Sequence, residues 1–118
     1  MENLPNYEKD VRPWGQFERF THCEHSTVKI ITINADEEFS LQTHEKRDEF
    51  WRVLSGFGVV TIGEKEGQDA SPGDEFFVPR GTKHRARSGE EGLVLLEIAF
   101  GEFDEGDITR LEDKYGRV

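Results

Sequence analysis

Three side chains that could bind a metal ion lie in one short polar segment of the sequence, and a fourth follows far downstream. Gln42 and His44 are two residues apart, so they point to the same side of an extended strand. Glu49 follows just before an apolar run, and His84 lies shortly after a strand predicted at 75–78. If these strands face one another, the four side chains converge inside a barrel.

This ligand set suits one divalent metal ion. Imidazole nitrogens bind zinc, copper, iron and nickel, whereas carboxylate and amide oxygens add harder character. We expect zinc, with manganese, cobalt, nickel or iron as alternatives. Gln42 is the weakest ligand, because a neutral amide binds a metal only through its oxygen. Taken singly, His44 and His84 are more often ordinary surface histidines than ligands, so the metal site depends on their spacing.

Length and composition limit the number of domains, the partners and the location that we expect for the protein. The chain has 118 residues, which suits a single domain over 1–118, and its net charge is -10. This charge argues against binding to nucleic acid or to an anionic membrane, and no apolar run is long enough to span a bilayer. The N-terminus has no charged-then-apolar signal pattern, and a single cysteine, Cys23, excludes an internal disulfide. We therefore expect a soluble cytoplasmic protein.

Short strands separated by turns containing Gly and Pro would position the ligands. Residues 1–11 are polar and are interpreted as an extended N-terminal arm. Strands are predicted at 16–20, 26–33, 39–44, 51–54, 57–62, 75–78 and 92–100. Ser55-Gly56 is typical of a hairpin, and residues 63–70 are predicted to be a polar turn. This pattern indicates an all-β sandwich or barrel.

Only the C-terminal segment changes character. Residues 107–116 are predicted to form a short helix, because Thr109 and Glu112 resemble a capping box and Gly116 suits the helix end. Arg110 would then lie near the start of a helix that closes the mouth of the barrel.

The spacing of ligands and glycines resembles the two motifs of the cupin superfamily. The first motif is matched by Gln42, His44, Glu49 and Gly56, with Gln in place of the first His. The second motif is matched by Gly73, Pro79, Gly81 and His84. The resemblance implies the cupin double-stranded β-helix, which is a jelly-roll barrel with the metal inside.

A narrower resemblance covers nearly the whole chain from Arg12 on. The matching segments are Arg12-Pro13-Trp14-Gly15, Phe17-Glu18, Val28-Lys29, Leu41 to Trp51, His84-Arg85 and Asp107 to Arg117. They look like the type II mannose-6-phosphate isomerase cupin, which is often the C-terminal part of a bifunctional enzyme behind a mannose-1-phosphate guanylyltransferase domain. Here Phe50 replaces a usual His and Ala99 a usual Gln, and both departures are expected near the pocket.

This resemblance implies a metal-dependent isomerase that interconverts mannose 6-phosphate and fructose 6-phosphate through an enediolate. Such a reaction needs a general acid/base, cations for the phosphate and the enediolate, and a metal that polarises the substrate oxygens. The cations that match the family are Lys29 and Arg110, expected to act in catalysis, and Arg47 and Arg85, expected to bind substrate. Glu97 is a further candidate for catalysis, because of its place in the chain. Glu97 interrupts an apolar strand, and burial there would tend to raise its pKa.

Alternatives stay open. The chain could be a non-catalytic cupin that binds a sugar or sugar phosphate, which is favoured by Phe50, Ala99 and the lack of a second domain in this sequence. It could also be a small oxygenase, because two His and a carboxylate suit iron. Each cation, taken singly, could be a solvated surface charge. We also expect a homodimer, because edge strands need covering and the N-terminal arm could cross to a partner.

Overall fold

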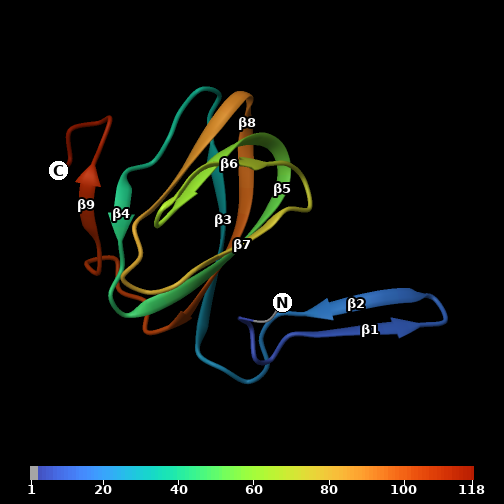
Figure 1. Cartoon of the computed structure of the whole chain (residues 1–118). Coiled ribbons are helices and arrows are strands. Elements are labelled where there is room, and N and C mark those ends of the chain that lie inside the picture. Colours follow the sequence, from blue (N-terminus) through green and yellow to red (C-terminus); the bar gives the residue numbers. More distant parts are fainter. Residues whose placement is uncertain (1–2) are drawn as a thin grey trace.

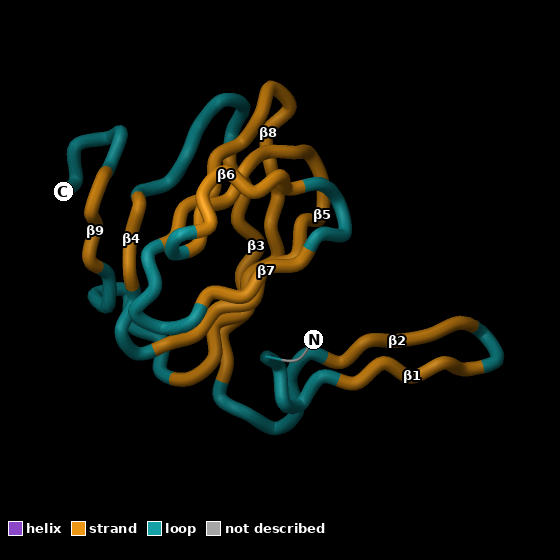
Figure 2. The backbone as a smooth tube through the Cα atoms, in the orientation of Figure 1, coloured by secondary structure: helices purple, strands orange, loops and turns teal. Residues whose placement is uncertain are grey.

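The computed structural model describes residues 3–118, and within them it contains strands and no helix (Figure 2). The main sheet consists of β3 (Ser26–Ile33), β4 (Leu41–Thr43), β5 (Arg47–Ile62), β6 (Lys65–Ala70), β7 (Glu75–Val78), β8 (His84–Gly101) and β9 (Thr109–Glu112). A separate hairpin consists of β1 (Glu8–Arg12) and β2 (Gly15–Arg19). The expected all-β architecture is confirmed. No described helix could cross a membrane.

Two long bent strands, β5 and β8, build the barrel, because each takes part in two facing layers (Figure 1). In one layer, the first half of β5 and the second half of β8 lie between β7 and β3. In the other layer, the second half of β5 pairs with β6, and the first half of β8 pairs with β4, which also pairs with β9. All these pairings are antiparallel, as expected for a jelly roll.

The prediction of a hairpin at Ser55-Gly56 is wrong, because β5 continues through both residues with register shifts on either side. Gly56 has a φ of 77°, and a Cβ at this position would lie 2.1 Å from the carbonyl oxygen of Gly92. The glycine therefore permits a bend pressed closely against β8 rather than a tight reversal of the chain.

The apolar core lies between the two layers. Its buried side chains are Ile33, Trp51, Val53, Val60, Ala70, Val78, Ala86, Leu93 and Leu95. Alternation along each strand decides which side chains enter it. On β3, for example, Ile33 is buried, whereas Val28 and Ile30 point outward and are exposed.

The C-terminal helix predicted for 107–116 is not observed, and this prediction is wrong. Thr109–Glu112 forms β9, which pairs antiparallel with β4. The local capping signal is worth little compared with backbone pairing to an available sheet edge, so tertiary context overrides it.

Two other predicted segments also contain strands. Residues 63–70, predicted as a turn, include β6. The expected N-terminal arm contributes β1, and residues 1–2 of that arm lie outside the described residues.

Candidate metal centre and active site

His44, Glu49 and His84 form a buried cluster inside the barrel. Their candidate ligand atoms all lie within 4.8 Å of one another. None of the three residues is more than 3% exposed. His44 follows β4, Glu49 lies near the start of β5, and His84 opens β8. Strand pairing therefore brings together residues that are far apart in the sequence, and the cluster could hold a metal ion.

Backbone carbonyls orient both imidazoles with one nitrogen turned into the cluster. His44 Nδ1 lies 2.6 Å from the carbonyl oxygen of Asp107, and His84 Nδ1 lies 2.9 Å from that of Thr82. Because a carbonyl only accepts hydrogen bonds, each Nδ1 carries a proton and each Nε2 keeps a lone pair. His84 Nε2 is buried and has no hydrogen-bond partner within residues 3–118. This arrangement is typical of metal-ligating histidines and fits a bound ion.

Glu49 is ionised although it is buried. Trp51 Nε1 donates to Glu49 Oε1 at 3.1 Å, and Arg47 Nε donates to Oε2 at 2.9 Å. Burial raises the pKa of Glu49, but the hydrogen bond and the positive charge of Arg47 hold it below its ordinary value. Burial lowers the pKa of His84, so its imidazole is neutral. An ionised carboxylate and neutral imidazoles are the forms that ligate a metal.

Arg47 lies inside the cluster rather than at its edge. It is 7% exposed, and its Nη2 lies 3.1 Å from His44 Nε2. Its guanidinium compensates the buried charge of Glu49 in this structure. Since His44 Nε2 is also a candidate ligand atom, metal binding requires Arg47 to give up this contact.

Gln42 lies beside the cluster but presents its amide nitrogen to it. Gln42 Nε2 is 3.4 Å from His44 Nε2, and Gln42 Oε1 accepts a hydrogen bond from Ser40 Oγ at 2.7 Å. A half-turn of the amide would direct Oε1 into the cluster and leave the amide nitrogen to donate to Ser40. Gln42 therefore lies where it could serve as a fourth ligand, but its oxygen is turned away from the cluster.

Glu97 and Lys29 lie on the inner side of the barrel near this cluster. They are directly opposite each other in the β3–β8 pairing, and Glu97 also lies opposite Trp51 on β5. Glu97 is only 5% exposed. Burial, and then the negative charge of Glu49, raises the pKa of Glu97 to about 7. The sequence-based expectation of a raised pKa at this position agrees with the structure.

The two other predicted arginines differ in position. Arg110 on β9 lies opposite Gln42 on β4, and its buried Nε has no hydrogen-bond partner in the described part of the chain. Arg85 follows His84 directly, so alternation turns it to the outer side of β8. There it donates to the carbonyl oxygens of Phe39 and Glu112 at 3.1 and 3.3 Å. The structure therefore brings Arg110 toward the site and leaves Arg85 outside it.

The two residues that depart from the family pattern, Ala99 and Phe50, lie on opposite faces of the sheet. Ala99 lies opposite Glu49 in the β5–β8 pairing and shares its inner face. Phe50, expected near the pocket, is instead buried on the outer face against Leu4 and Ile98. Only Ala99 can therefore alter the shape of the site directly.

The loop between β8 and β9 contacts the cations of the site. The ring centroid of Phe103 lies 4.3 Å from Lys29 Nζ and 4.4 Å from Arg47 Cζ. Glu105 Oε1 lies 3.6 Å from Lys29 Nζ. Phe103 and Glu105 were not predicted as residues of the site, and neither was Asp107 as the residue whose carbonyl orients His44. An acidic run next to an apolar strand is the only sequence signal that could have drawn attention to this loop.

Comparison with known proteins gives the family. Residues 2–113 match the family model described as "Mannose-6-phosphate isomerase C-terminal". The xanthan biosynthesis protein XanB of Xanthomonas campestris pv. campestris is 37% identical over 114 residues, covering 95% of this chain and 24% of XanB. The mannose-1-phosphate guanylyltransferase ManC of Salmonella typhimurium is 36% identical over 109 residues, covering 91% of this chain and 22% of ManC. The chain thus spans about a quarter of the length of these curated relatives.

Solved structures agree with this assignment. A protein from Acidithiobacillus ferrooxidans, provisionally described as a sugar phosphate isomerase, has a TM-score of 0.59 and 30% identity, covering 69% of this chain and 53% of that protein. A conserved protein of Klebsiella pneumoniae with a double-stranded β-helix domain shares the fold alone, with a TM-score of 0.66 and 16% identity, covering 92% of this chain and 87% of that protein. The expected double-stranded β-helix is thereby confirmed. The chain belongs to the mannose-6-phosphate isomerase C-terminal family of cupin domains.

Proposed function

We propose that this domain is a metal-dependent isomerase that interconverts mannose 6-phosphate and fructose 6-phosphate. The observation that carries the proposal is the buried cluster of His44, Glu49 and His84, which faces the same interior as Glu97 and several cations. These three side chains would hold one divalent ion, with zinc the first choice. The bound ion would polarise the oxygens of the substrate. The family description and the provisional isomerase among the solved structures support the substrate class.

Gln42 would complete the ligand set. With its amide turned, its oxygen would join the two imidazoles and the carboxylate, and the mixed set would leave room for substrate oxygens. Ser40 would then hold the amide nitrogen and keep this orientation.

Glu97 is the group proposed to move the proton. Its carboxylate takes the proton from C2 of the open-chain aldose, and the electrons of that C–H bond form a C1–C2 double bond while negative charge moves to the carbonyl oxygen. The resulting enediolate receives the same proton at C1, and a proton passes from the C2 hydroxyl to the C1 oxygen. No atom or electron is gained or lost, as an isomerisation requires. Because Glu97 shares the inner face with Glu49, it is placed to act beside the ligand cluster.

Three cations supply the positive charge for the phosphate and the enediolate. Arg110 offers a forked guanidinium whose Nε is unused by the described residues, which suits two hydrogen bonds to an anion. Lys29 lies opposite Glu97 and would stabilise negative charge near the proton-transfer site. Arg47 would bind substrate once it leaves His44. Arg85 is engaged on the outer side and is not part of the proposed site.

Substrate entry requires the loop between β8 and β9 to move. Phe103 covers both Lys29 and Arg47, and the carboxylate of Glu105 pairs with Lys29. An anionic substrate would compete with Glu105 for Lys29. Glu105 is 82% exposed at its side chain, so this contact is weak and easily exchanged.

The test is a coupled assay of both sugar phosphates with the domain reconstituted in turn with zinc, manganese, cobalt, nickel and iron. We expect turnover with at least one metal, loss of turnover with a chelator, and recovery when the metal is restored. His84→Ala serves as the inactive control. Absence of turnover with every metal, in protein shown to contain the metal, would refute the isomerase proposal.

A second candidate is a domain that binds a sugar phosphate without converting it. It is favoured by Ala99, which lies on the inner face opposite Glu49 where the family resemblance leads us to expect Gln. Titration calorimetry of the metal-loaded domain with fructose 6-phosphate separates the two candidates. Binding without turnover that is abolished in an Arg110→Ala variant would favour this second function.

A further inference from the structure

Arg47 connects the ligand cluster to the loop between β8 and β9. Toward the cluster, its Nε donates to Glu49 Oε2 at 2.9 Å and its Nη2 donates to His44 Nε2 at 3.1 Å. Toward the loop, its Nη1 donates to the carbonyl oxygen of Asp104 at 3.4 Å, and its Cζ lies 4.4 Å from the ring centroid of Phe103. The guanidinium is rigid and planar, so these four contacts belong to one position of the group. A ligand that displaces Arg47 from the cluster therefore also changes its contacts with the loop.

Arg47 uses the lone pairs that a metal ion would need. His44 Nε2 accepts from Arg47 because Nδ1 of the same ring donates to a backbone carbonyl. Glu49 Oε2, which accepts from Arg47 Nε, lies 3.5 Å from His44 Nε2. A lone pair cannot serve a guanidinium and a metal ion at the same time, and two cations so close repel each other. In this structure Arg47 thus supplies the positive charge that Glu49 requires, and a metal ion would take over that role.

The loop between β8 and β9 is anchored at its end and held closed in its middle. At its end, both carboxylate oxygens of Asp107 accept hydrogen bonds, each at 3.0 Å, from the two backbone N–H groups that follow His44. In its middle, the half-buried ring of Phe103 lies over Lys29 and Arg47. Contacts between a cation and an aromatic face are individually modest. Loss of the Arg47 contacts would therefore release the middle of the loop while Asp107 still holds its end.

The two cations under Phe103 suit an anion once the loop is released. Lys29 Nζ lies 3.6 Å from a carboxylate oxygen of Glu105, which belongs to the loop and would leave with it. Arg47, no longer balanced by Glu49, would carry a charge without a partner. Lysine and arginine together suit the oxygens of a phosphate ester, the arginine through two parallel hydrogen bonds.

We propose that Arg47 couples the metal site to the anion site. Without the ion, Arg47 balances Glu49 and holds the loop closed. With the ion, Arg47 leaves the cluster, the loop opens, and Arg47 and Lys29 bind an anion of the phosphate-ester class. The ion and the anion therefore bind with positive cooperativity, and each raises the affinity of the other by the same factor. This inference rests on the proposed function only for the identity of the anion, a sugar phosphate.

The affinity for zinc, measured at pH 8 by competition with a chelating dye, gives the first test. Arg47→Met removes the group that zinc must displace, so we expect the dissociation constant of zinc to fall roughly 5-fold or more. A residue that only supported the fold or a ligand would have the opposite effect when lost. A dissociation constant that is unchanged or raised in the Arg47→Met protein would overturn the proposal.

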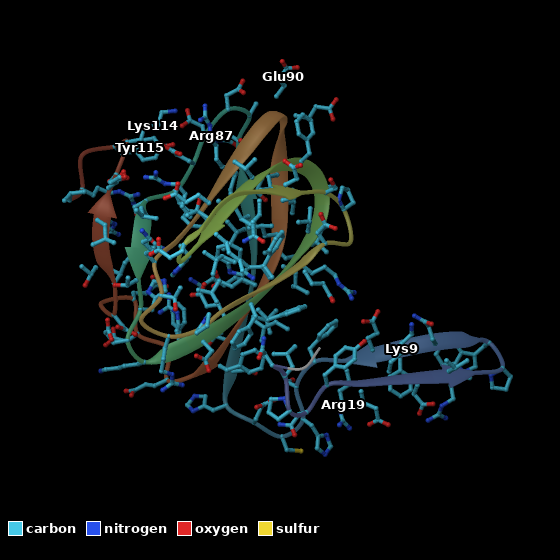
Figure 3. The ribbon with its side chains drawn as sticks, viewed as in Figure 1. Lys9, Arg19, Arg87, Glu90, Lys114 and Tyr115 are labelled. Carbon is cyan, nitrogen blue, oxygen red and sulfur yellow. The ribbon has the colours of Figure 1, made fainter. Side chains whose placement is uncertain are left out.

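Two variants control for the loss of positive charge. Lys29→Met removes an equal charge from under the same ring, but Lys29 pairs with Glu105 of the loop. Arg87→Met removes a distant charge, because Figure 3 shows Arg87 and Glu90 toward the upper end of the barrel, whereas the loop between β8 and β9 lies at its lower end. We expect both controls to change the dissociation constant of zinc less than Arg47→Met does. An equal fall in either control would assign the effect to general electrostatics and reject the proposed displacement.

The position of the loop gives a second test that leaves Arg47 in place. A Phe103→Trp variant keeps an aromatic ring over the two cations, and quenching of its emission by acrylamide reports how exposed the loop is. The unchanged chain, measured in parallel, gives the contribution of Trp14 and Trp51. We expect zinc to increase the quenching of the introduced tryptophan, and to have no such effect when Arg47→Met is added. Quenching that zinc leaves unchanged or decreases would contradict loop opening.

The anion gives a third test. Saturating fructose 6-phosphate should lower the dissociation constant of zinc roughly 5-fold or more, whereas fructose, which lacks the phosphate, should not. The effect of fructose 6-phosphate should shrink in the Arg47→Met protein. An undiminished effect there would mean that the phosphate acts on the ion itself, and the coupling through Arg47 would be rejected.

These measurements do not depend on turnover. A domain that lacks isomerase activity but gives the three expected results would retain the coupling and lose the proposed reaction. Turnover together with an unchanged zinc affinity in the Arg47→Met protein would retain the reaction and reject the coupling. Circular dichroism and unfolding curves show whether each variant is folded. If the Arg47→Met protein does not fold, the response of the Phe103→Trp protein to zinc decides the question.

Discussion

The inner and outer faces of β5 and β8 depart from the usual distribution of side chains in opposite ways. Inside, Glu49, His84 and Glu97 are polar residues buried in the barrel. Outside, Val28 and Ile30 are apolar residues exposed to solvent on the strand next to β8. Buried polar groups and exposed apolar patches are the informative exceptions in a soluble domain. The inner region could hold a metal ion, and the outer region leaves apolar side chains uncovered.

The two regions also differ in how precisely their side chains must be positioned. The inner groups are fixed by directional hydrogen bonds, such as those from Trp51 to Glu49 and from the histidines to backbone carbonyls. The outer surface relies on apolar area, which has no preferred direction. Single changes inside should therefore cause large and specific losses, and changes at the base of the hairpin should cause small ones. The following predictions test this difference.

The largest effect is expected for His84→Ala. It removes the Nε2 atom that has no hydrogen-bond partner among the described residues, and it should abolish stoichiometric metal uptake with little loss of fold. Elemental analysis after metal loading measures this. His22→Ala is the matched control, because His22 is exposed and outside the cluster. Undiminished metal in the His84 variant would show that the ligand assignment is wrong.

Arg110→Lys should have the next largest effect. The charge remains but the fork is lost, so we expect kcat to fall by roughly 100-fold if Arg110 acts in the transition state. If Arg110 only binds the phosphate, KM should rise with kcat little changed. Steady-state kinetics with equal metal content separates these outcomes.

The control for Arg110 is Arg87→Lys, which changes an exposed arginine on the outer side of β8 and should leave both constants unchanged. Full activity and full sugar-phosphate affinity in an Arg110→Ala protein would instead assign Arg110 to a structural role.

Trp51→Phe should have an intermediate effect. The aromatic ring is kept, but the donor to Glu49 Oε1 is lost. Outer partners of metal ligands are typically worth about 10–100-fold in metal affinity, so we expect the dissociation constant of the metal to rise by about tenfold. Competition with a chelating dye measures it. Trp14→Phe is the matched control and should not change metal affinity, because Trp14 lies on the hairpin.

The smallest effect is expected for Glu18→Gln at the base of the hairpin. The hydrogen bond from Tyr7 and then that from Arg52 lower the pKa of Glu18 in the folded state. A group with a lowered folded pKa stabilises the fold above its unfolded pKa, and this stabilisation is lost as pH falls through the lower folded value.

The substitution should therefore reduce the free energy of unfolding by about 1 kcal/mol or less near neutral pH. The difference should vanish in acid, below the folded pKa of Glu18. Chemical unfolding at several pH values measures it. A difference that grows as the pH is lowered would contradict the assigned interaction.

Several features follow from the sequence itself, because they depend on local patterns. Strand Ser26–Ile33 was predicted with the observed bounds, since β-branched residues and period-two alternation favour extended backbone. The spacing of Gln42, His44, Glu49 and His84 matches the two cupin motifs, and through that resemblance the sequence predicted a ligand set, of which His44, Glu49 and His84 are found clustered. The alternation of side chains on β8 also predicts that Arg85, next to the inward-facing His84, points outward, although Arg85 was expected to bind substrate.

Only the tertiary structure decided the remaining features, because a strand does not specify its partner by local pattern. The segment around Arg110 has a helix-like sequence, yet pairing with β4 makes it β9. Gly56 is typical of a turn, yet the close approach of Gly92 makes it a bend. The neighbours that hold His44 and cover Lys29 come from the loop after β8, far away in the sequence. Contacts over such separations depend on how β5 and β8 fold over each other, and no local pattern in the sequence encodes them.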